Sequence, residues 1–178
     1  MRIVAGAHKG RKLNAPPDYQ VRPTADKVKE ALFSIIQNHV PGSVVCDLFA
    51  GTGTLGLEAL SRGAKKCYFG DHAGNSIKLV RDNVKLCNEG RNSVITHGDY
   101  RRILDNIGEK VDVFLLDPPY DKKLLEQAIE EVSERHLLAQ GGIVVAEHSR
   151  DHMLPDTLGR LEKKKEKRYG TVVLSIFM

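Results

Sequence analysis

Apolar stretches of strand length alternate with helical patterns between residues 43 and 149. The strand-like runs cover residues 43–49, 66–71, 93–99, 111–120 and 141–149, and the helical runs cover residues 54–63, 75–90, 100–108 and 122–138. Parallel strands need a crossover connection, which is usually a helix. The alternation therefore predicts a doubly wound, mostly parallel α/β sheet.

The two ends of the chain depart from this alternation. Residues 158–169 and 170–178 predict an antiparallel strand pair around Gly170, which brings the expected sheet to seven strands. Residues 1–16 predict a small β-hairpin, and residues 22–39 an amphipathic helix that begins near Pro23 and Thr24. A chain of 178 residues fits one domain, 1–178, in which residues 1–40 form the hairpin and helix extension and residues 41–178 the sheet.

Composition excludes several classes of protein. No apolar run approaches the ~20 residues of a membrane helix, and the start of the sequence has no signal-peptide apolar region, so we expect a cytoplasmic protein. The three cysteines are scattered without a C-x-x-C pair, which favours reduced core thiols over a zinc site or disulfides. We expect no metal.

Positive charge is concentrated at the start of the sequence. Arg2, Lys9, Arg11 and Lys12 lie within the first fourteen residues, which contain no acidic residue, and the remaining chain has 23 basic and 23 acidic residues. A basic segment on a balanced body suggests a polyanion partner such as nucleic acid. A solvated basic tail explains the charge equally well.

Residues 51–56, GTGTLG, match the nucleotide-binding fingerprint G-x-G-x-x-G, and they lie between a predicted strand and a predicted helix. The fingerprint alone allows NAD, which is held by its pyrophosphate, or S-adenosylmethionine, which has no phosphate. The acidic residues near it bear on this choice.

Four aspartates lie at the ends of predicted strands, namely Asp47, Asp71, Asp99 and Asp117. The carboxyl ends of parallel strands share one edge of the sheet, so we expect these residues around one pocket. Asp71, twenty residues beyond Gly51, suits the ribose hydroxyls of either cofactor. Asp47 would repel a pyrophosphate and attract the ammonium of a methionine moiety, so we predict S-adenosylmethionine, with Asp99 accepting a hydrogen bond from the adenine amine.

The sequence DPPY at residues 117–120 ends the most apolar predicted strand. Two prolines fix two φ angles and remove two N–H donors, which leaves the Asp117 side chain and the Pro118 carbonyl as acceptors for the N–H bonds of a planar exocyclic amine. Tyr120 offers a face on which a base can stack. The alternative is a rigid loop at the end of a strand.

Together, DLFAGTGTLGLEAL, GD at 70–71, HGD and DPPY resemble the class I S-adenosylmethionine-dependent amino-methyltransferases, which have a Rossmann-like fold. The segments MRIVAGAHKGRKL, RPTADKVKEALFSII and KEKRYGTVVLSIF resemble the bacterial RsmD-type family over essentially the whole chain. The resemblance implies methylation of the exocyclic N2 of a guanine in 16S ribosomal RNA, with ribosomal RNA or a small-subunit particle as the partner.

The resemblance also implies roles for individual residues. The cofactor would be bound by Asp47, Ala50, Gly51, Gly53, Asp71, His72, Asp99, Tyr100 and Thr24. The guanine amine would be held by Asp117, Pro118, Pro119 and Tyr120. With the charge pattern, RNA would be contacted by Arg2, Lys9, Arg11, Lys12 and Arg22. Thr24 could equally be a helix cap. At the end of the second strand the family typically has Glu, and here the shorter Asp71 takes its place. The next residue, His72, is expected to form a wall of the pocket.

Other functions stay open at this stage. Methylation of adenine N6 or of a protein glutamine amide would use a similar planar amine. A nicotinamide oxidoreductase would leave DPPY unexplained, and an RNA-binding module without activity would not need acids around the loop. The sequence does not identify the modified nucleotide, and we expect a monomer.

Overall fold

The computed structural model of the chain describes residues 1–20, 23–119 and 122–178, without the side chains of residues 23, 24 and 122. Arg22 and Tyr120, two of the predicted site residues, lie outside the described residues, and so does the side chain of Thr24. Within the described ranges, no helix has the length and apolar character needed to cross a membrane.

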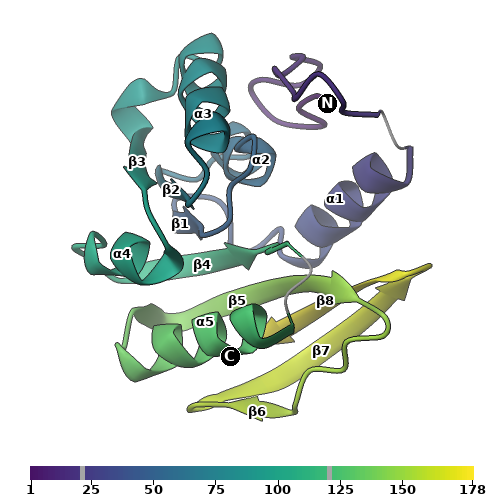
Figure 1. Cartoon of the computed structure of the whole chain (residues 1–178), viewed down its shortest axis with the longest axis vertical. Helices are drawn as coiled ribbons and strands as arrows, with labels where there is room; N and C mark the ends of the chain where they lie inside the picture. Colours follow the sequence, from purple (N-terminus) through teal and green to yellow (C-terminus); the bar gives the residue numbers. More distant parts are fainter. Residues whose placement is uncertain (21–22, 120–121) are drawn as a thin grey trace.

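Eight strands form one sheet in the order β3-β2-β1-β4-β5-β8-β7-β6 (Figure 1). The strands are β1 (Val44–Asp47), β2 (Lys66–Asp71), β3 (Ser93–His97), β4 (Val111–Leu116), β5 (Leu138–Ser149), β6 (Thr157–Leu158), β7 (Leu161–Tyr169) and β8 (Val172–Phe177). The first five in sheet order are parallel, β8 pairs antiparallel with β5, and β7 pairs antiparallel with β8. The mostly parallel sheet is confirmed. The predicted count of seven strands was one short, because two-residue β6 is too short to leave a pattern in the sequence.

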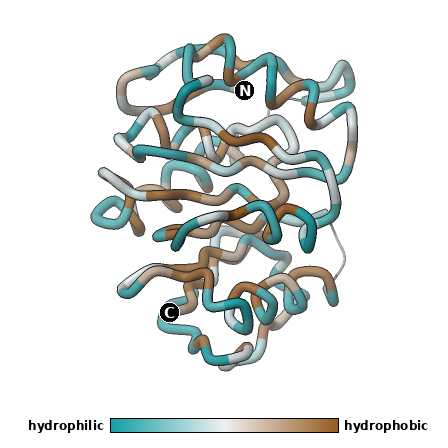
Figure 2. Tube along the Cα trace, turned by 90° about the vertical axis from the view of Figure 1, so that its left-hand side faces the viewer, coloured by the Kyte–Doolittle hydropathy of each residue, from teal (hydrophilic) through white to brown (hydrophobic). Residues whose placement is uncertain are grey.

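Helices cover both faces of the sheet, as a doubly wound fold requires. They are α1 (Pro23–Ile35), α2 (Thr54–Ser61), α3 (Gly74–Leu86), α4 (Tyr100–Asp105) and α5 (Lys122–Glu134). Alternate residues of each strand point to opposite faces. Val113 and Leu115 of β4 therefore pack in the core under α1, α2 and α3, while Phe114 and Leu116 pack in the core under α4 and α5. Hydrophobic stretches recur along the strands in the middle of the molecule in Figure 2.

Strand β5 begins three residues earlier than predicted. Leu138 pairs with Val111, and the register then shifts before Ile143 pairs with Val113. Gly141 takes a left-handed φ of 74° within this irregularity, and a side chain at Gly142 would come within 3.0 Å of the Asp112 carbonyl oxygen. The two glycines that were expected to start the strand therefore form a bulge inside it.

The predicted N-terminal hairpin is present in a short form, with an antiparallel bridge between Arg2 and Lys12. Two backbone hydrogen bonds flank the bridge, from the Ile3 N–H to the Arg11 carbonyl and from the Leu13 N–H to the Met1 carbonyl. The hairpin is short because the next backbone donors along the chain bind another element. The N–H groups of Val4 and Ala5 donate to the Glu58 carboxylate of α2, at 2.9 and 3.0 Å, instead of to a partner strand. Residues 1–14, which we call the N-terminal segment, thus lie against α2 and α3 (Figure 1).

Buried side chains hold the N-terminal segment in place. Glu58 is fully buried, and it also accepts from the Arg62 Nε at 3.0 Å and pairs with the Lys29 Nζ at 3.3 Å. Asn83 of α3 is equally buried, and its amide nitrogen donates to the backbone oxygens of Asn14 and Thr52, at 3.0 and 2.9 Å. Since Thr52 belongs to the glycine loop, the segment and the loop share one hydrogen-bonded support.

Candidate active site at the carboxyl edge of the sheet

The carboxyl ends of the parallel strands bring acidic residues together on one face. Asp47 ends β1 and Asp71 ends β2, while Asp117 directly follows β4. Each is two residues beyond a core residue of the α1–α3 side, namely Val45, Phe69 and Leu115. Because side chains alternate along a strand, the three carboxyls point to the side of the sheet where the glycine loop lies.

Asp47 is almost completely buried, with 1% of its surface exposed. Its Oδ2 accepts a 2.9 Å bond from the Gly56 N–H, and its Oδ1 has no hydrogen-bond partner among the described residues. Burial raises the pKa of Asp47 to about 7, the bond from Gly56 opposes this, and the charges of Asp117 and Asp71 add to it. The site therefore contains a buried carboxyl group with one oxygen available as an acceptor. A cation bound nearby would favour the ionised form of this group.

The glycine loop is bound by carboxylates. Asp71 Oδ2 accepts from the Gly51 N–H and its Oδ1 from the Ala73 N–H, both at 2.9 Å. In a dinucleotide site, such loop N–H groups face the pyrophosphate. Here the Gly51 and Gly56 donors are already bonded to acids, which is unfavourable for a phosphate and compatible with a cationic ligand.

The loop geometry explains its glycines. Gly51 and Gly53 have φ angles of 57° and 81°, which favour glycine. A side chain at Gly51 would meet no atom within 4 Å, so space is open beside the loop. At Gly56 a Cβ would lie 2.3 Å from the Phe69 ring, so this glycine permits the close approach of α2 to β2. Ala50 is buried and its N–H donates to the Gly70 carbonyl.

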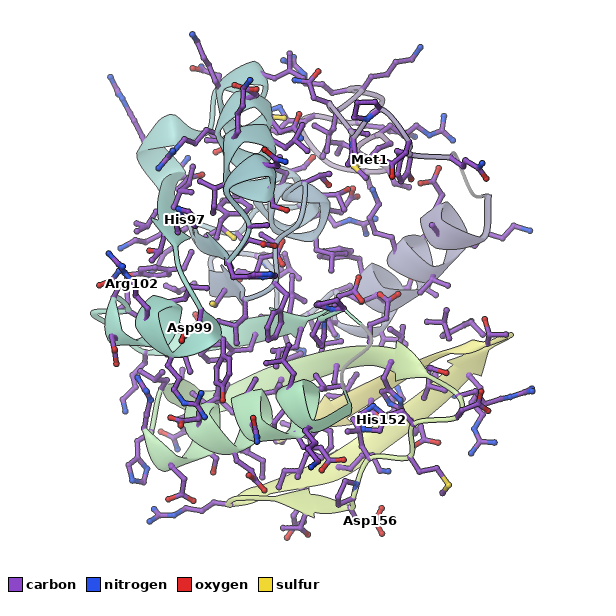
Figure 3. All side chains as sticks on the ribbon, in the orientation of Figure 1. Met1, His97, Asp99, Arg102, His152 and Asp156 are labelled. Atoms are coloured by element: carbon purple, nitrogen blue, oxygen red, sulfur yellow. The ribbon has the colours of Figure 1, made fainter. Side chains whose placement is uncertain are left out.

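Among the described side chains of the predicted cofactor set, those of His72 and Asp99 are the exposed ones. The His72 side chain is 71% exposed, with Nδ1 at 3.6 Å from Asp71 Oδ1. Asp99 caps α4 by accepting from the Arg102 N–H at 2.9 Å, and in Figure 3 the two lie at the start of that helix. One Asp99 oxygen is used as the cap. The next residue, Tyr100, is buried with its ring 6.3 Å from that of Phe49.

Asp117 has a neighbour that the sequence analysis missed. The register pairs Leu116 with Ala146, so the next residue of each strand brings Asp117 beside Glu147 of β5. Although the Asp117 residue is exposed, protein around its carboxyl raises the pKa to about 6. Burial and the charge of Asp117 raise the pKa of Glu147 to about 8. Pro118 is half-buried and Pro119 exposed. The signal for Glu147 was an acid within an otherwise apolar strand end, IVVAEHS.

The predicted RNA-contacting residues lie on the N-terminal segment. Lys9 and Lys12 are exposed, and neither has an ion-pair partner within the described ranges. Arg2 lies 3.6 Å from Asp26, and Arg11 donates to the Leu86 carbonyl at 2.5 Å. The segment reaches the glycine loop, since the sulfur of Met1, labelled in Figure 3, lies 2.9 Å from Thr52 Oγ1. It is therefore a folded rim beside the site and not a free tail.

Histidine, cysteine and acidic side chains do not gather into a metal-binding group of three or more anywhere in residues 1–20, 23–119 and 122–178. The three cysteines are buried and reduced.

Comparison with known proteins identifies the family. The family described as "Conserved hypothetical protein 95" matches residues 1–178. The chain is 37% identical to "Putative rRNA methyltransferase YlbH" of Bacillus subtilis, over 99% of this chain and 98% of that protein. The chain belongs to the RsmD/YlbH family of rRNA methyltransferases.

Two other relatives of the RsmD/YlbH family agree. The chain is 35% identical to "Ribosomal RNA small subunit methyltransferase D" of Haemophilus influenzae, over 99% of this chain and 93% of that protein. The structure of "Putative methyltransferase yhhF" from Escherichia coli superposes with a TM-score of 0.88 at 26% identity, covering 99% of this chain and 96% of that one. The predicted fold, that of the class I S-adenosylmethionine-dependent methyltransferases, is confirmed.

Proposed function

We propose that the protein transfers a methyl group from S-adenosylmethionine to the exocyclic N2 of a guanine in small-subunit ribosomal RNA. One observation carries the choice of cofactor: the N–H groups of Gly51 and Gly56 are bonded to Asp71 and Asp47, which argues against a phosphate ligand. The names of the relatives support ribosomal RNA of the small subunit as the substrate.

The residues at the loop fit this cofactor. The unpartnered Asp47 oxygen suits its ammonium group, and Asp71 suits its ribose hydroxyls. The open space at Gly51 leaves room for it, with Gly53 and Ala50 shaping the loop. Asp99, Tyr100 and His72 would then surround the adenine and ribose, with Thr24 at the entrance. The bound cofactor supplies an electrophilic methyl group.

The chain's own part in the chemistry is to prepare the amine. The N2 lone pair of guanine is delocalised into the ring and is a poor nucleophile. Asp117 and the Pro118 carbonyl accept the two N–H bonds, which favours a pyramidal nitrogen with an exposed lone pair, and Pro119 keeps the loop rigid. As N2 gains the methyl group it becomes strongly acidic and releases one proton, which Asp117 can pass to solvent. Tyr120 provides the stacking face in this proposal.

The N-terminal segment gives RNA a positive surface beside this site. Lys9 and Lys12 are free to bind phosphates, while Arg2 and Arg11 have weak or neutral protein partners that a phosphate can replace. Arg22 belongs to the same proposed surface.

The proposal is tested by incubating the protein with labelled S-adenosylmethionine and either small-subunit RNA or small-subunit particles. The labelled nucleosides are then identified. We expect N2-methylguanosine as the labelled product. N6-methyladenosine, or label in protein, would contradict the substrate and favour the corresponding methyltransferase. In parallel, S-adenosylhomocysteine should raise the melting temperature and NAD should not. The reverse result would overturn the choice of cofactor.

A further inference from the structure

Glu147 stands beside the proposed amine site but has no part in the function described so far. Four successive pairs, from Val113–Ile143 to Leu116–Ala146, fix the parallel register of β4 and β5. The strands of such a pair are about 4.8 Å apart, so Asp117 and Glu147, next in register, are lateral neighbours. Glu147 follows Val145 by two residues and therefore points to the same face as Asp117.

These two carboxyls lack the hydrogen bonds that the other acids of the site have. Neither accepts a bond from a described residue, whereas Asp71 accepts two from backbone N–H groups. On its other side Glu147 is next to Leu174 of β8, and Lys167 of β7 lies one strand further away. Among the residues that the structure describes, no lysine, arginine or histidine forms an ion pair with Glu147.

The buried Asp47 belongs to the same group of carboxyls. Its Oδ1 has no hydrogen-bond partner in the described chain, and only 1% of the residue is exposed. The charge of Asp117 raises the pKa of Asp47, which places the two carboxyls near each other. Unpaired buried acceptors are rare in folded proteins because they cost stability, so the unused Asp47 oxygen indicates that a ligand completes this edge of the sheet, where Asp117 and Glu147 also lie.

Two carboxyls this close do not readily carry two negative charges. Burial and the neighbouring charge raise the pKa of Glu147 to about 8, above that of Asp117, at about 6. At neutral pH, the proton that the pair retains is therefore held mainly by Glu147. A neutral carboxyl has one O–H donor and one carbonyl acceptor side by side.

We propose that Glu147 reads the target base: its neutral carboxyl accepts from N1–H and donates to O6 of the guanine whose N2 amine is held by Asp117. The inference rests on the proposed guanine methylation and names the residue that selects guanine. N2, N1 and O6 lie in sequence along one edge of guanine, and two adjacent side chains, one a methylene longer than the other, can follow that edge. Adenine, held by its N6 amine, would offer the same carboxyl only the N1 acceptor.

A base analogue makes the proposal testable. RNA with 2-aminopurine at the methylated position keeps the N2 amine but lacks N1–H and O6. Single-turnover rates with saturating cofactor are compared for guanine and 2-aminopurine RNA, using wild type, Glu147→Gln, Glu147→Met and the control Glu130→Gln, which removes an exposed α5 carboxyl. Wild type should prefer guanine by about 10–100-fold, the effect of two hydrogen bonds.

The variants should separate recognition from other roles. Glu147→Gln retains a donor and an acceptor and should keep most of the preference. Glu147→Met is apolar and of similar length, so it should fold, show an unchanged thermal shift with S-adenosylhomocysteine, and lose both the guanine rate and the preference by about 10–100-fold. Its rate on 2-aminopurine RNA should barely change, a result that a merely structural role would not give.

Three outcomes would overturn the proposal. A Glu147→Met protein that keeps the guanine preference would show that Glu147 does not touch the base. A Glu147→Gln protein as inactive as Glu147→Met would assign Glu147 to proton transfer instead. Wild type that makes no N2-methylguanosine would defeat the proposed function as well, whereas in the first two cases that function stands.

Discussion

The two halves of the carboxyl edge are prepared in different ways. On the cofactor half, Asp71 and Asp47 are bonded to backbone N–H groups of the loop and its helix. On the base half, Asp117 and Glu147 lie side by side without hydrogen-bond donors from the described residues. The carboxylates of the cofactor half are thus positioned by the protein itself, whereas those of the base half are free to form their hydrogen bonds with a ligand. Loss of a side chain should therefore affect binding on one half and turnover on the other.

The largest effect is expected at Asp117. Asp117→Ala should lose about 2–4 kcal/mol of transition-state stabilisation, because one acceptor for the amine is removed. Asp117→Asn should keep appreciable turnover, since an amide oxygen can accept the same hydrogen bond. The measurement is the single-turnover rate with saturating cofactor. Equal inactivity of the two variants would instead make Asp117 an obligatory base.

Asp71→Ala supplies the reciprocal control. It should weaken S-adenosylhomocysteine binding by about 1–3 kcal/mol, since charge-assisted hydrogen bonds are lost, and leave the saturated single-turnover rate close to wild type. Calorimetry of both variants completes the comparison. If Asp117→Ala weakens cofactor binding as much as Asp71→Ala does, the two halves are not separate.

Asp47 predicts a pH dependence of stability. Its pKa is about 7 in the folded chain and about 4 in an unfolded one. Between these two pH values the folded state binds a proton that the unfolded state has released. The contribution of Asp47 to the free energy of unfolding is therefore most favourable below about pH 4, and it decreases as the pH rises to about 7. The loss is at most about 1.4 kcal/mol for each pH unit.

Asp47→Asn isolates this contribution. The amide can still accept from Gly56 but does not titrate. His148, whose pKa is lowered by burial, acts in the opposite direction, so the quantity to measure is the difference in unfolding free energy between wild type and Asp47→Asn at pH 5 to 8. The advantage of wild type should shrink with rising pH. A difference independent of pH would show that Asp47 has an ordinary pKa.

The smallest effect is expected on the rim. Replacing Lys9 and Lys12 by Gln should weaken RNA binding about tenfold and reduce the slope of log affinity against log salt by about 1.5. Cofactor affinity should not change, because neither lysine contacts the glycine loop. Lys65 and Lys110 directly precede β2 and β4, at the edge of the sheet opposite the candidate site. Replacing these two lysines by Gln provides the control. An unchanged salt slope for the Lys9 and Lys12 variant would remove the segment from the RNA surface.

Sequence patterns predicted the parallel strands well because a strand buried on both faces, such as β4, is a continuous apolar run. They overestimated the length of the N-terminal hairpin because no pattern reveals that Val4 and Ala5 donate to Glu58, a residue more than fifty positions away. Asp47 and Asp71 were found through their spacing to the loop. Glu147 was missed because its meaning depends on the register of β5 with β4, which is set only in three dimensions.

The attachment of the N-terminal segment also determines how it moves. Its amides at Val4, Ala5 and Asn14 are bonded to side chains of Glu58 and Asn83 and not to a strand ladder. The segment should therefore exchange its amide hydrogens as one unit, and each opening leaves the Glu58 charge with fewer donors, so openings are rare. Asn83, which holds the segment at Asn14, also donates to the Thr52 carbonyl of the glycine loop. An opening of the segment therefore removes part of the support of that side chain, and the surface offered to RNA and the loop offered to the cofactor should open and close on a common time scale.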